Sequence, residues 1–380
     1  MTTTLRVIVD DIVAPKPGGM GRYTEELTRE LIRTAPAGCR VSGIVSSSPD
    51  QEYDRLHTLL PGLGDLFKSA LARRELQFAW QHGVTRLPGN GMVHATSLMA
   101  PLSKHDRVNN TGDQTVVTVH DVVPWTHPQT MSPRQVSWAR GMAKRAFKYA
   151  DAVVVPTHSV AQALDEIHGF GERIRVIPGA VGSRLVVPVD AADRAAALGL
   201  PDRYVLSAGT LDPRKGIEPL IRSLASEADA GLPLFIAGPI GFGDIDVAGI
   251  AEDAGLSEGR VTSLGVLSDA DLSAALDRAT VFAFPSLAEG FGLPMLEAFH
   301  FGTPVVHSDA PAVLEVAAGS GLAVAIDDAD GYPDRLAAAI ANVVGDEAFA
   351  RRLGYAGIDR AAAFSWRNSA QQIWQLHADL

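Results

Sequence analysis

Residues 280–297 read TVFAFPSLAEGFGLPMLE: a short apolar run, a glycine-rich turn and the start of a helix. The run Thr280–Phe284 is too short for a buried helix and lacks the alternation of a half-exposed strand. It therefore predicts a strand covered on both faces, as in parallel sheets. Pro294 suits the first turn of a helix, where its missing N–H costs nothing. The stretch predicts one strand–turn–helix unit of an α/β protein.

The same alternation extends in both directions from this stretch. In the predicted helix Glu25–Ile32, the apolar residues Leu27, Leu31 and Ile32 share one face. Alternating strand and helix signals are typical of doubly wound parallel sheets. The predicted strands are Leu5–Val9, Arg40–Val45, Thr115–Val119, Ala152–Val155, Tyr204–Ala208, Leu234–Ala237, Thr280–Phe284 and Thr303–Val306, and further helices are predicted at Ile217–Leu224 and Asp271–Leu276.

The strand series occurs twice, which predicts two domains in a chain of 380 residues. Between the series, Ile177–Leu200 contains turn-forming residues such as Pro178, Gly179, Gly182 and Pro188, as expected of a linker. We predict an N-terminal domain over residues 1–182 and a C-terminal domain over residues 183–365. The helical rhythm of residues 366–380, with no strand after it, predicts a last helix that packs back on the first domain.

Composition excludes several classes of protein. Apolar residues make up 46% of the chain and charged residues 20%, which predicts a packed core rather than disorder. The net charge of −11 argues against a nucleic-acid partner, which would need a broad basic surface. Cys39 is the single cysteine, so no intrachain disulfide can form. With no stretch long enough to span a membrane, we expect a cytoplasmic protein.

Ligands of parallel sheets bind at the carboxyl ends of the strands. In the loop Lys16–Tyr23 (KPGGMGRY), Gly18 and Gly19 would let a ligand approach backbone amides at a helix N-terminus, although an ordinary flexible loop fits equally well. His120 follows a predicted strand beside Asp121. It is either a site residue or a hydrogen-bonded histidine at a strand end.

Two loops of the predicted second domain carry charged candidates. In Gly209–Gly216 (GTLDPRKG), the fork of Arg214 and the point charge of Lys215 suit a diphosphate, unless they form a solvated basic pair. In the opening stretch, Glu289 precedes the glycine-rich turn and Glu297 lies about one turn into the helix. Carboxylates so placed can accept hydrogen bonds from sugar hydroxyls at two places on one long ligand. The alternative is a solvated loop acid and an acid that favours the helix start.

Together these motifs resemble the large retaining glycosyltransferase family 4. Glu289 and Glu297 form the E-x7-E pattern typical of that family, and similar elements follow in the expected order from about Arg6 to Trp374. These elements are the glycine loop Gly18–Tyr23, the histidine–aspartate element Thr118–Asp121, the serine turn Thr157–Ser159, the arginine–lysine loop Gly209–Gly216, the base-recognition turn Gly265–Val266 and the final strand Gly302–Val306.

The resemblance implies the GT-B fold, with two Rossmann-like doubly wound parallel-sheet domains facing a central cleft. It implies that the N-terminal domain lies on the acceptor side and that the C-terminal domain binds the nucleotide-sugar donor. It implies a retaining hexosyltransferase of polysaccharide biosynthesis that uses a nucleotide-diphosphate sugar and a saccharide or glycolipid acceptor. The run His120–Pro124 is similar to that of mannosyltransferases, which makes GDP-mannose the favoured donor. Two alternatives stay open: a nucleotide-sugar epimerase or phosphorylase of similar fold, and a catalytically silent nucleotide-sugar-binding module.

The resemblance also assigns roles to individual residues. Glu297 is expected to hold the donor ribose, and Arg214 and Lys215 to neutralise the leaving diphosphate. Glu289 is expected to hold the transferred sugar, and His120 to contact that sugar from the other domain. The remaining donor-binding candidates are Gly18, Gly19, Gly209, Thr210, Val266, Gly290, Phe291, Gly292 and Leu293.

Two further patterns concern a metal and a membrane. The triplets Asp244–Asp246 and Asp269–Asp271 resemble divalent-cation sites, but the first lies in a polar loop and Asp269 resembles a helix cap. We therefore predict a metal-independent protein without cofactors. The segment Phe67–Trp80 predicts a basic amphipathic helix, which either packs on its own domain or rests on the inner face of a membrane.

Overall fold

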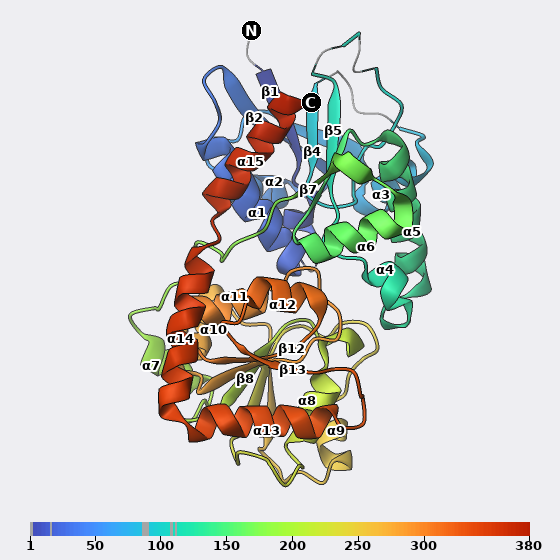
Figure 1. The fold of residues 1–380 in the computed structure, drawn as a ribbon. Coiled ribbons are helices and arrows are strands. Elements are labelled where there is room, and N and C mark those ends of the chain that lie inside the picture. Colours follow the sequence, from blue (N-terminus) through green and yellow to red (C-terminus); the bar gives the residue numbers. More distant parts are fainter. Residues whose placement is uncertain (1–2, 16, 86–90, 107–108, 111) are drawn as a thin grey trace. The chain divides into compact units, whose positions relative to one another are not determined.

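The computed structural model describes residues 3–15, 17–85, 91–106, 109–110 and 112–380, so Lys16 of the predicted glycine loop lies outside the described residues. The chain divides into two compact units (Figure 1). Unit 1 comprises residues 1–126, 133–179 and 365–380. Unit 2 comprises residues 127–132 and 180–364. Each unit is built on a parallel sheet.

Within its described residues, unit 1 contains a 7-stranded parallel sheet of strand order β3-β2-β1-β4-β5-β6-β7. The order reverses between β1 and β4, the switch point where sheets of this kind bind ligands. The elements are β1 (Thr3–Ile8), α1 (Gly18–Arg33), β2 (Cys39–Ser47), α2 (Asp50–Leu59), β3 (Leu66–Ala72), α3 (Arg73–His82), β4 (Met92–Ala95), β5 (Gln114–Thr118), α4 (Val123–Thr126), α5 (Pro133–Tyr149), β6 (Ala152–Val155), α6 (His158–His168), β7 (Ile174–Val176) and α15 (Trp366–Asp379).

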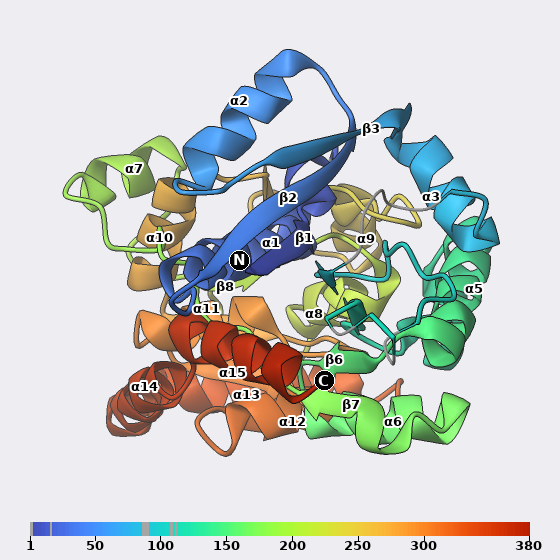
Figure 2. The ribbon, with the colours of Figure 1, turned by 90° about the horizontal axis from the view of Figure 1, so that it is seen from above.

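Helices cover both faces of this sheet. On one face, Trp80 of α3, Met142 of α5 and Leu164 of α6 join a buried cluster with strand residues such as Val117. Elsewhere in unit 1, α1 packs against α15, where the indole Nε1 of Trp374 donates a hydrogen bond to the Leu31 carbonyl at 3.1 Å. Figure 2 shows the edge strands at opposite sides of unit 1, β3 next to α3 and β7 next to α6.

Within its described residues, unit 2 contains a 6-stranded parallel sheet of strand order β10-β9-β8-β11-β12-β13, which reverses between β8 and β11. Its elements are α7 (Ala191–Ala197), β8 (Val205–Ala208), α8 (Ile217–Ser223), β9 (Leu234–Ala237), α9 (Val247–Asp253), β10 (Val261–Gly265), α10 (Asp269–Arg278), β11 (Val281–Phe284), α11 (Leu293–His300), β12 (Val305–Ser308), α12 (Pro311–Ala317), β13 (Leu322–Val324), α13 (Tyr332–Gly345) and α14 (Glu347–Ala362).

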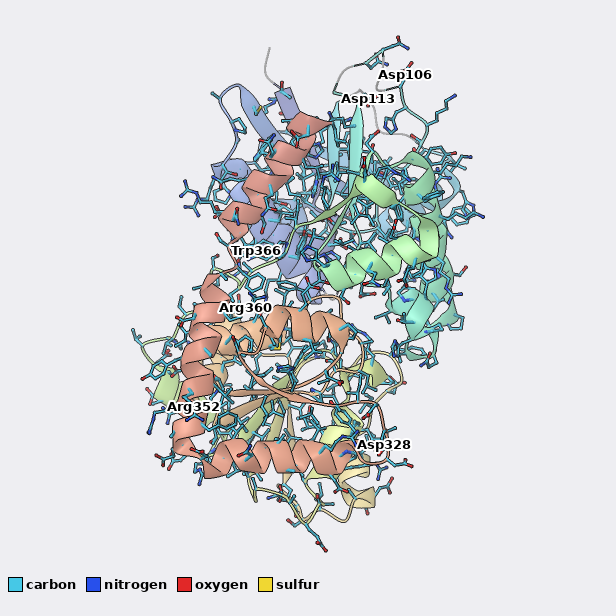
Figure 3. All side chains as sticks on the ribbon, in the orientation of Figure 1. Asp106, Asp113, Asp328, Arg352, Arg360 and Trp366 are labelled. Carbon is cyan, nitrogen blue, oxygen red and sulfur yellow. The ribbon has the colours of Figure 1, made fainter. Side chains whose placement is uncertain are left out.

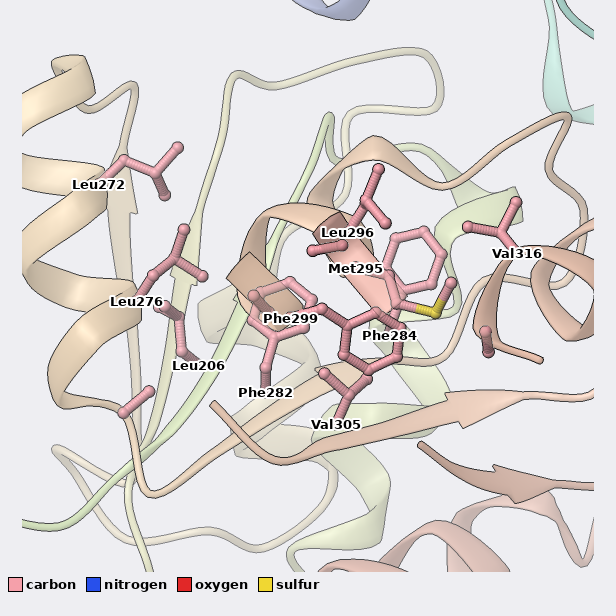
Figure 4. Close-up of a cluster of buried hydrophobic side chains, with 14 of the residues drawn as sticks. Leu206, Leu272, Leu276, Phe282, Phe284, Met295, Leu296, Phe299, Val305 and Val316 are labelled. Atoms are coloured by element: carbon pink, nitrogen blue, oxygen red, sulfur yellow. The ribbon is translucent and has the colours of Figure 1, made fainter. Parts of the chain in front are cut away.

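The central strand β11 shows why continuous apolar runs mark this sheet. Phe282 and Phe284 join a cluster with α10, α11 and α12, which Figure 4 shows around Met295 and Phe299. Val281 and Ala283, which point the opposite way, join a second cluster with α8, α9 and α13. Because successive side chains of a strand face opposite sides, a strand covered by helices on both faces is apolar at every position.

The predicted fold class of two Rossmann-like parallel-sheet domains is confirmed. The strands Ala152–Val155 and Leu234–Ala237 have the predicted bounds. The helix predicted over Phe67–Trp80 is wrong in its first half, because Leu66–Ala72 forms the edge strand β3 beside β2. Phe67 and Lys68 therefore do not lie on an amphipathic helix, and the argument for membrane contact fails. Among the described residues, no helix combines the length and apolarity needed to cross a bilayer.

Candidate functional site

The stretch that opened the sequence analysis forms β11, a turn and α11. Gly292 is the N-cap of α11 and has φ +91°, a left-handed conformation that favours glycine. A Cβ atom there would also lie 3.2 Å from the Phe284 ring, a tight contact that the ring could relieve only by shifting. Pro294 occupies the first turn of the helix as predicted. The N-terminus of α11, with its partial positive charge, therefore lies at the carboxyl end of the central strand β11.

The arginine–lysine loop is held against this turn. Pro213–Lys215 forms a single 3-10 turn that ends at Gly216, with φ +67°. A Cβ on Gly216 would lie 2.1 Å from the carbonyl oxygen of Pro285, so only glycine permits this approach. The Leu287 N–H also donates to the Arg214 carbonyl at 2.7 Å. These backbone contacts join the loop after β8 to the loop after β11.

Within these two loops, the three predicted charged residues meet. The Lys215 ammonium donates to Oε1 of Glu289, and Arg214 Nη1 lies 3.4 Å from Oε2 of the same carboxylate. Arg214 Nη1 also donates to the Ala288 carbonyl at 3.1 Å. The Glu289 side chain is 8% exposed and that of Lys215 is 12% exposed. The structure thus places two cations and one carboxylate together, partly shielded from water.

The electrostatics of this charged cluster follow from burial and pairing. Burial opposes ionisation of Glu289, but Lys215 and Arg214 outweigh it, so the pKa of Glu289 is below its ordinary value. Burial lowers the pKa of Lys215, an effect that Glu289 opposes. These three side chains alone, two cations and one anion, carry a net positive charge beside a helix N-terminus, and Asp212 of the same loop also acts on Lys215. This arrangement suits a diphosphate.

The other predicted residues of unit 2 surround the same sheet edge. Gly209 and Thr210 follow β8 and pack against the loop after β9, where a Cβ on Gly238 would lie 1.8 Å from the Gly209 carbonyl oxygen. Gly290 and Phe291 are buried in the turn before α11, and Leu293 is half-buried at the start of that helix. Glu297 is buried within α11. Val266 follows β10 and is 73% exposed.

In unit 1, the predicted residues lie near the switch point of the sheet. Gly18 and Gly19 are exposed in the first turn of α1, which begins earlier than the predicted helix. His120 is half-buried after β5, and its Nε2 lies 2.8 Å from the Thr96 carbonyl. The Tyr23 ring contacts the rings of His120, at 4.6 Å between centroids, and of Trp366, at 5.2 Å (Figure 3 labels Trp366).

His120 has the properties of a hydrogen-bonding group at neutral pH. Burial lowers its pKa, which the Thr96 carbonyl, Asp121 and Asp11 oppose. Because a carbonyl oxygen only accepts, Nε2 carries the proton and donates to Thr96. The neutral ring then has its lone pair on Nδ1, an acceptor suited to a sugar hydroxyl. His120 is thus a hydrogen-bonded histidine at a strand end, and its role as a site residue stays a prediction.

The sequence analysis missed an acidic pair in unit 1. Asp10 and Asp11 form a 3-10 turn directly after β1, and both are buried. Arg73, the first residue of α3, pairs with Oδ2 of Asp10 and, at 2.6 Å, with Oδ1 of Asp11. Their position could have indicated a site, because two consecutive carboxylates directly follow the first predicted strand and ligands bind at the carboxyl ends of such strands. Their arginine partner is 62 residues or more away in sequence and could not be recognised without the fold.

The two aspartate triplets have structural partners. Asp269 pairs with Arg184 and Asp271 with Arg194, each at 2.8 Å. The predicted cap at Asp269 is wrong, because the hydroxyl of Ser268 caps α10 and Asp269 is the first helical residue. Asp246 caps α9 by accepting from the Gly249 N–H. Among the described residues, no group of three or more histidine, cysteine or acidic side chains has the arrangement of a metal site.

Known proteins similar to this chain agree with the fold and the motifs. The model described as Glycosyltransferase Family 4 matches residues 17–183, and that described as Glycosyl transferases group 1 matches residues 190–360. The MMP alpha-(1->4)-mannosyltransferase of Mycolicibacterium hassiacum is 32% identical over an alignment of 410 residues that covers 93% of each chain. The serotype-specific mannosyltransferase WbdA of Escherichia coli is 32% identical over 270 residues, 68% of this chain and 32% of WbdA. This chain thus spans about a third of the length of WbdA.

A solved structure shows the same fold over the whole chain. HepE of Anabaena, in complex with UDP and glucose, has a TM-score of 0.75 at 19% identity and covers 100% of both chains. The two parallel-sheet units and this likeness define a GT-B protein. With the family models and the relatives above, the chain belongs to glycosyltransferase family 4.

Proposed function

We propose that this protein is a retaining glycosyltransferase that moves mannose from GDP-mannose to a hydroxyl group of a saccharide or glycolipid. The observation that carries the proposal is the convergence of Arg214 and Lys215 on Glu289 beside the N-terminus of α11. A departing nucleoside diphosphate gains negative charge as the glycosidic bond breaks. Pre-placed cations and helix amides lower the barrier to its departure. The mannosyltransferases among the relatives support mannose as the transferred sugar.

In this proposal, the two loops of unit 2 bind the donor. Arg214 and Lys215 hold the diphosphate, and Glu289 accepts hydrogen bonds from the sugar. Glu297 binds the ribose hydroxyls, and Val266 contacts the base. Gly209, Thr210 and the turn Gly290–Leu293 bring backbone close to the phosphates. His120 of unit 1 contacts the transferred sugar. The reaction needs no metal, because the cationic pair supplies the positive charge.

A donor screen tests this function. The protein is incubated with GDP-mannose, UDP-glucose, UDP-galactose or UDP-N-acetylglucosamine, and the rise in Tm is measured for each, because a ligand bound only by the native state stabilises it. Transfer is then followed by release of nucleoside diphosphate with a panel of mono- and disaccharides, and proton NMR gives the anomeric configuration of the product. We expect the largest shift and α-linked product with GDP-mannose. Transfer from a UDP-sugar alone would refute the donor, and binding without turnover would refute the enzyme.

A further inference from the structure

An orphaned carboxylate oxygen lies at the carboxyl edge of the unit 1 sheet. Asp11 is 3% exposed, and its Oδ1 accepts a hydrogen bond from Arg73 at 2.6 Å. Its other oxygen, Oδ2, is also buried, yet it has no hydrogen-bond donor among the described residues. A buried acceptor of this kind costs free energy unless a ligand or water satisfies it. Asp10 differs, because the Ser46 N–H donates to its Oδ1 and Arg73 pairs with its Oδ2.

The surroundings of Asp11 are those of a binding site. It lies in the 3-10 turn Asp10–Val13 that comes after β1, and β1 borders the switch point between β1 and β4. Thr96, which follows β4, accepts from His120 Nε2 through its carbonyl, and its hydroxyl hydrogen-bonds with that of Thr24 at 2.8 Å. Asp11 is close enough to His120 to act on its charge. Asp11, Thr96 and His120 thus belong to loops at one edge of the sheet, where ligands of doubly wound folds bind.

The backbone at Asp11 also fixes the start of α1. A Cβ on Gly21 would lie 2.9 Å from the carbonyl oxygen of Asp11, so glycine lets the first turn of α1 press against the loop after β1. Arg73 and this close approach hold the Asp11 side chain in place. The carboxylate thus has one oxygen paired with Arg73 and one buried oxygen without a protein donor, and the second can accept a hydrogen bond from a ligand. The guanidinium of Arg73 is shared by Asp10 and Asp11, so these three side chains keep one net negative charge, and a hydroxyl group can satisfy Oδ2 by donating a hydrogen bond to it.

We propose that Oδ2 of Asp11 binds a hydroxyl group of the acceptor saccharide. The inference rests on the proposed function, in which unit 2 holds the donor and unit 1 receives the acceptor. Arg73 is the positioning residue, since it saturates Oδ1 and leaves Oδ2 for the ligand. Asp11 donates no proton and forms no covalent bond with the sugar; its hydrogen bond orients the hydroxyl that attacks.

The test compares transfer with hydrolysis of the donor. Asp11→Asn keeps the shape of the side chain. Because the Arg73 guanidinium can only donate hydrogen bonds, the amide oxygen of the asparagine turns toward Arg73, and the amide NH2 group then occupies the place of Oδ2. An acceptor of hydrogen bonds is thereby replaced by a donor. With GDP-mannose and the saccharide that wild-type protein uses fastest, we expect the acceptor KM to rise about 10-fold or more, the scale of a lost charged hydrogen bond. Hydrolysis of GDP-mannose by water and the affinity for GDP should not change.

Two further variants keep the test sharp. Asp11→Glu keeps the charge that pairs with Arg73 but moves the carboxylate, so it should also raise the acceptor KM if Asp11→Asn does not fold. Asp10→Asn is the control, because both oxygens of Asp10 have protein donors; it should lower Tm without changing the acceptor KM. An unchanged acceptor KM in folded Asp11 variants, or a change in donor hydrolysis instead, overturns the inference. The inference is also overturned if the wild-type protein hydrolyses GDP-mannose but transfers mannose to no saccharide. If the wild-type protein uses no donor at all, the proposed function itself is refuted.

Discussion

Lys215 and Glu289, 74 residues apart in sequence, form an ion pair at the carboxyl end of the unit 2 sheet, with Arg214 on the other oxygen of the carboxylate. The two loops that hold the pair touch at Gly216, where a Cβ would lie 2.1 Å from the Pro285 carbonyl oxygen. The ion pair places cationic charge at the position from which a diphosphate would leave. Because Glu289 is the partner of both cations, neither cation is buried without an opposite charge. Four of the following predictions concern unit 2, and the fifth concerns unit 1.

Replacing Lys215 by alanine should reduce kcat/KM by about 10²-fold or more, the scale for losing a pre-placed charge at a developing anion. The measurement is steady-state release of GDP from GDP-mannose with a saccharide acceptor. Arg222→Ala is the control, since Arg222 forms only an exposed pair with Glu218 on α8 and should keep wild-type activity. A folded Lys215→Ala protein with near-wild-type turnover would remove Lys215 from the mechanism.

Replacing Glu289 by glutamine should make the protein less stable and more responsive to nucleotide. Removing one partner of a buried pair leaves the cations uncompensated, which typically costs about 3–5 kcal/mol. The side chains of Lys215 and Arg214 are 12% and 20% exposed, so water screens part of this cost. The phosphates of GDP should restore the missing negative charge. We therefore expect a lower Tm than wild type and a larger rise in Tm with saturating GDP; equal rises would contradict this reading of the cluster.

Replacing Glu297 by alanine should weaken GDP binding. Losing a charged hydrogen-bond partner costs about 1.5–3 kcal/mol, or roughly 10- to 150-fold in affinity. Isothermal titration calorimetry with GDP measures the effect, and circular dichroism checks the fold because Glu297 is buried. Glu218→Ala is a control for loss of a helix carboxylate away from the site, since Glu218 lies in the first turn of α8 and its side chain is 54% exposed. If both variants bind GDP as wild type does, Glu297 does not bind the ribose.

Transfer should continue in the presence of excess EDTA. The carboxylates of Asp269 and Asp271 are paired with arginines, and that of Asp246 caps a helix. These partners leave the triplets poorly suited to a divalent ion. The assay compares initial rates with EDTA, with Mg²⁺ and with Mn²⁺. Loss of activity with EDTA that is restored by either metal would disprove the prediction.

Acid should weaken the attachment of α15 to unit 1. Burial lowers the pKa of His377 to about 4, below the ordinary value of roughly 6.5 in an unfolded chain. The unfolded state therefore binds the proton first, so stability is intact above about pH 6.5 and decreases as pH falls toward 4. Hydrogen exchange of the α15 amides at pH 7.5 and 5 measures this change, after correction for the intrinsic rates.

The control for this acid effect is His377→Gln, which removes the titrating ring but not the carboxylates that titrate in the same range. The free energy of opening of α15 should depend less on pH in this variant than in wild type. His94, whose ring lies 5.6 Å from that of His377 and whose pKa burial also lowers, should account for part of what remains. Identical pH dependence in the two proteins would exclude His377 as the cause.

The sequence predicted those elements whose environment is uniform. Ala152–Val155 and Leu234–Ala237 were found with their correct bounds because buried neighbours on both faces require apolar residues throughout. The edge strand Leu66–Ala72 was mistaken for a helix, since it is partly exposed and carries Lys68 within an apolar run. Helix α1 was predicted to begin at Glu25, but it begins at Gly18, because its first turn consists of glycines that weaken the helix signal.

The site was predicted in part for a similar reason. Arg214, Lys215 and Glu289 could be chosen because each lies in a loop after a strand, but their contact depends on the adjacency of β8 and β11 in the sheet. Asp11 lies in an equivalent place in unit 1. Its unsatisfied oxygen depends on Arg73, whose position relative to Asp11 no local pattern could predict.

The two units differ in the order in which a ribosome completes them. Apart from residues 127–132, unit 2 is continuous from Ala180 to Phe364, so its whole sheet is synthesised before α15. Unit 1 is completed only when α15 has been made, because Trp374 and His377 bond to Leu31 and Gln114. During synthesis, the face of α1 that contacts α15 therefore stays uncovered while residues 34–365 are added. A chain that stops after Phe364 would keep the charged cluster of unit 2 and lose the packing that α15 contributes to unit 1.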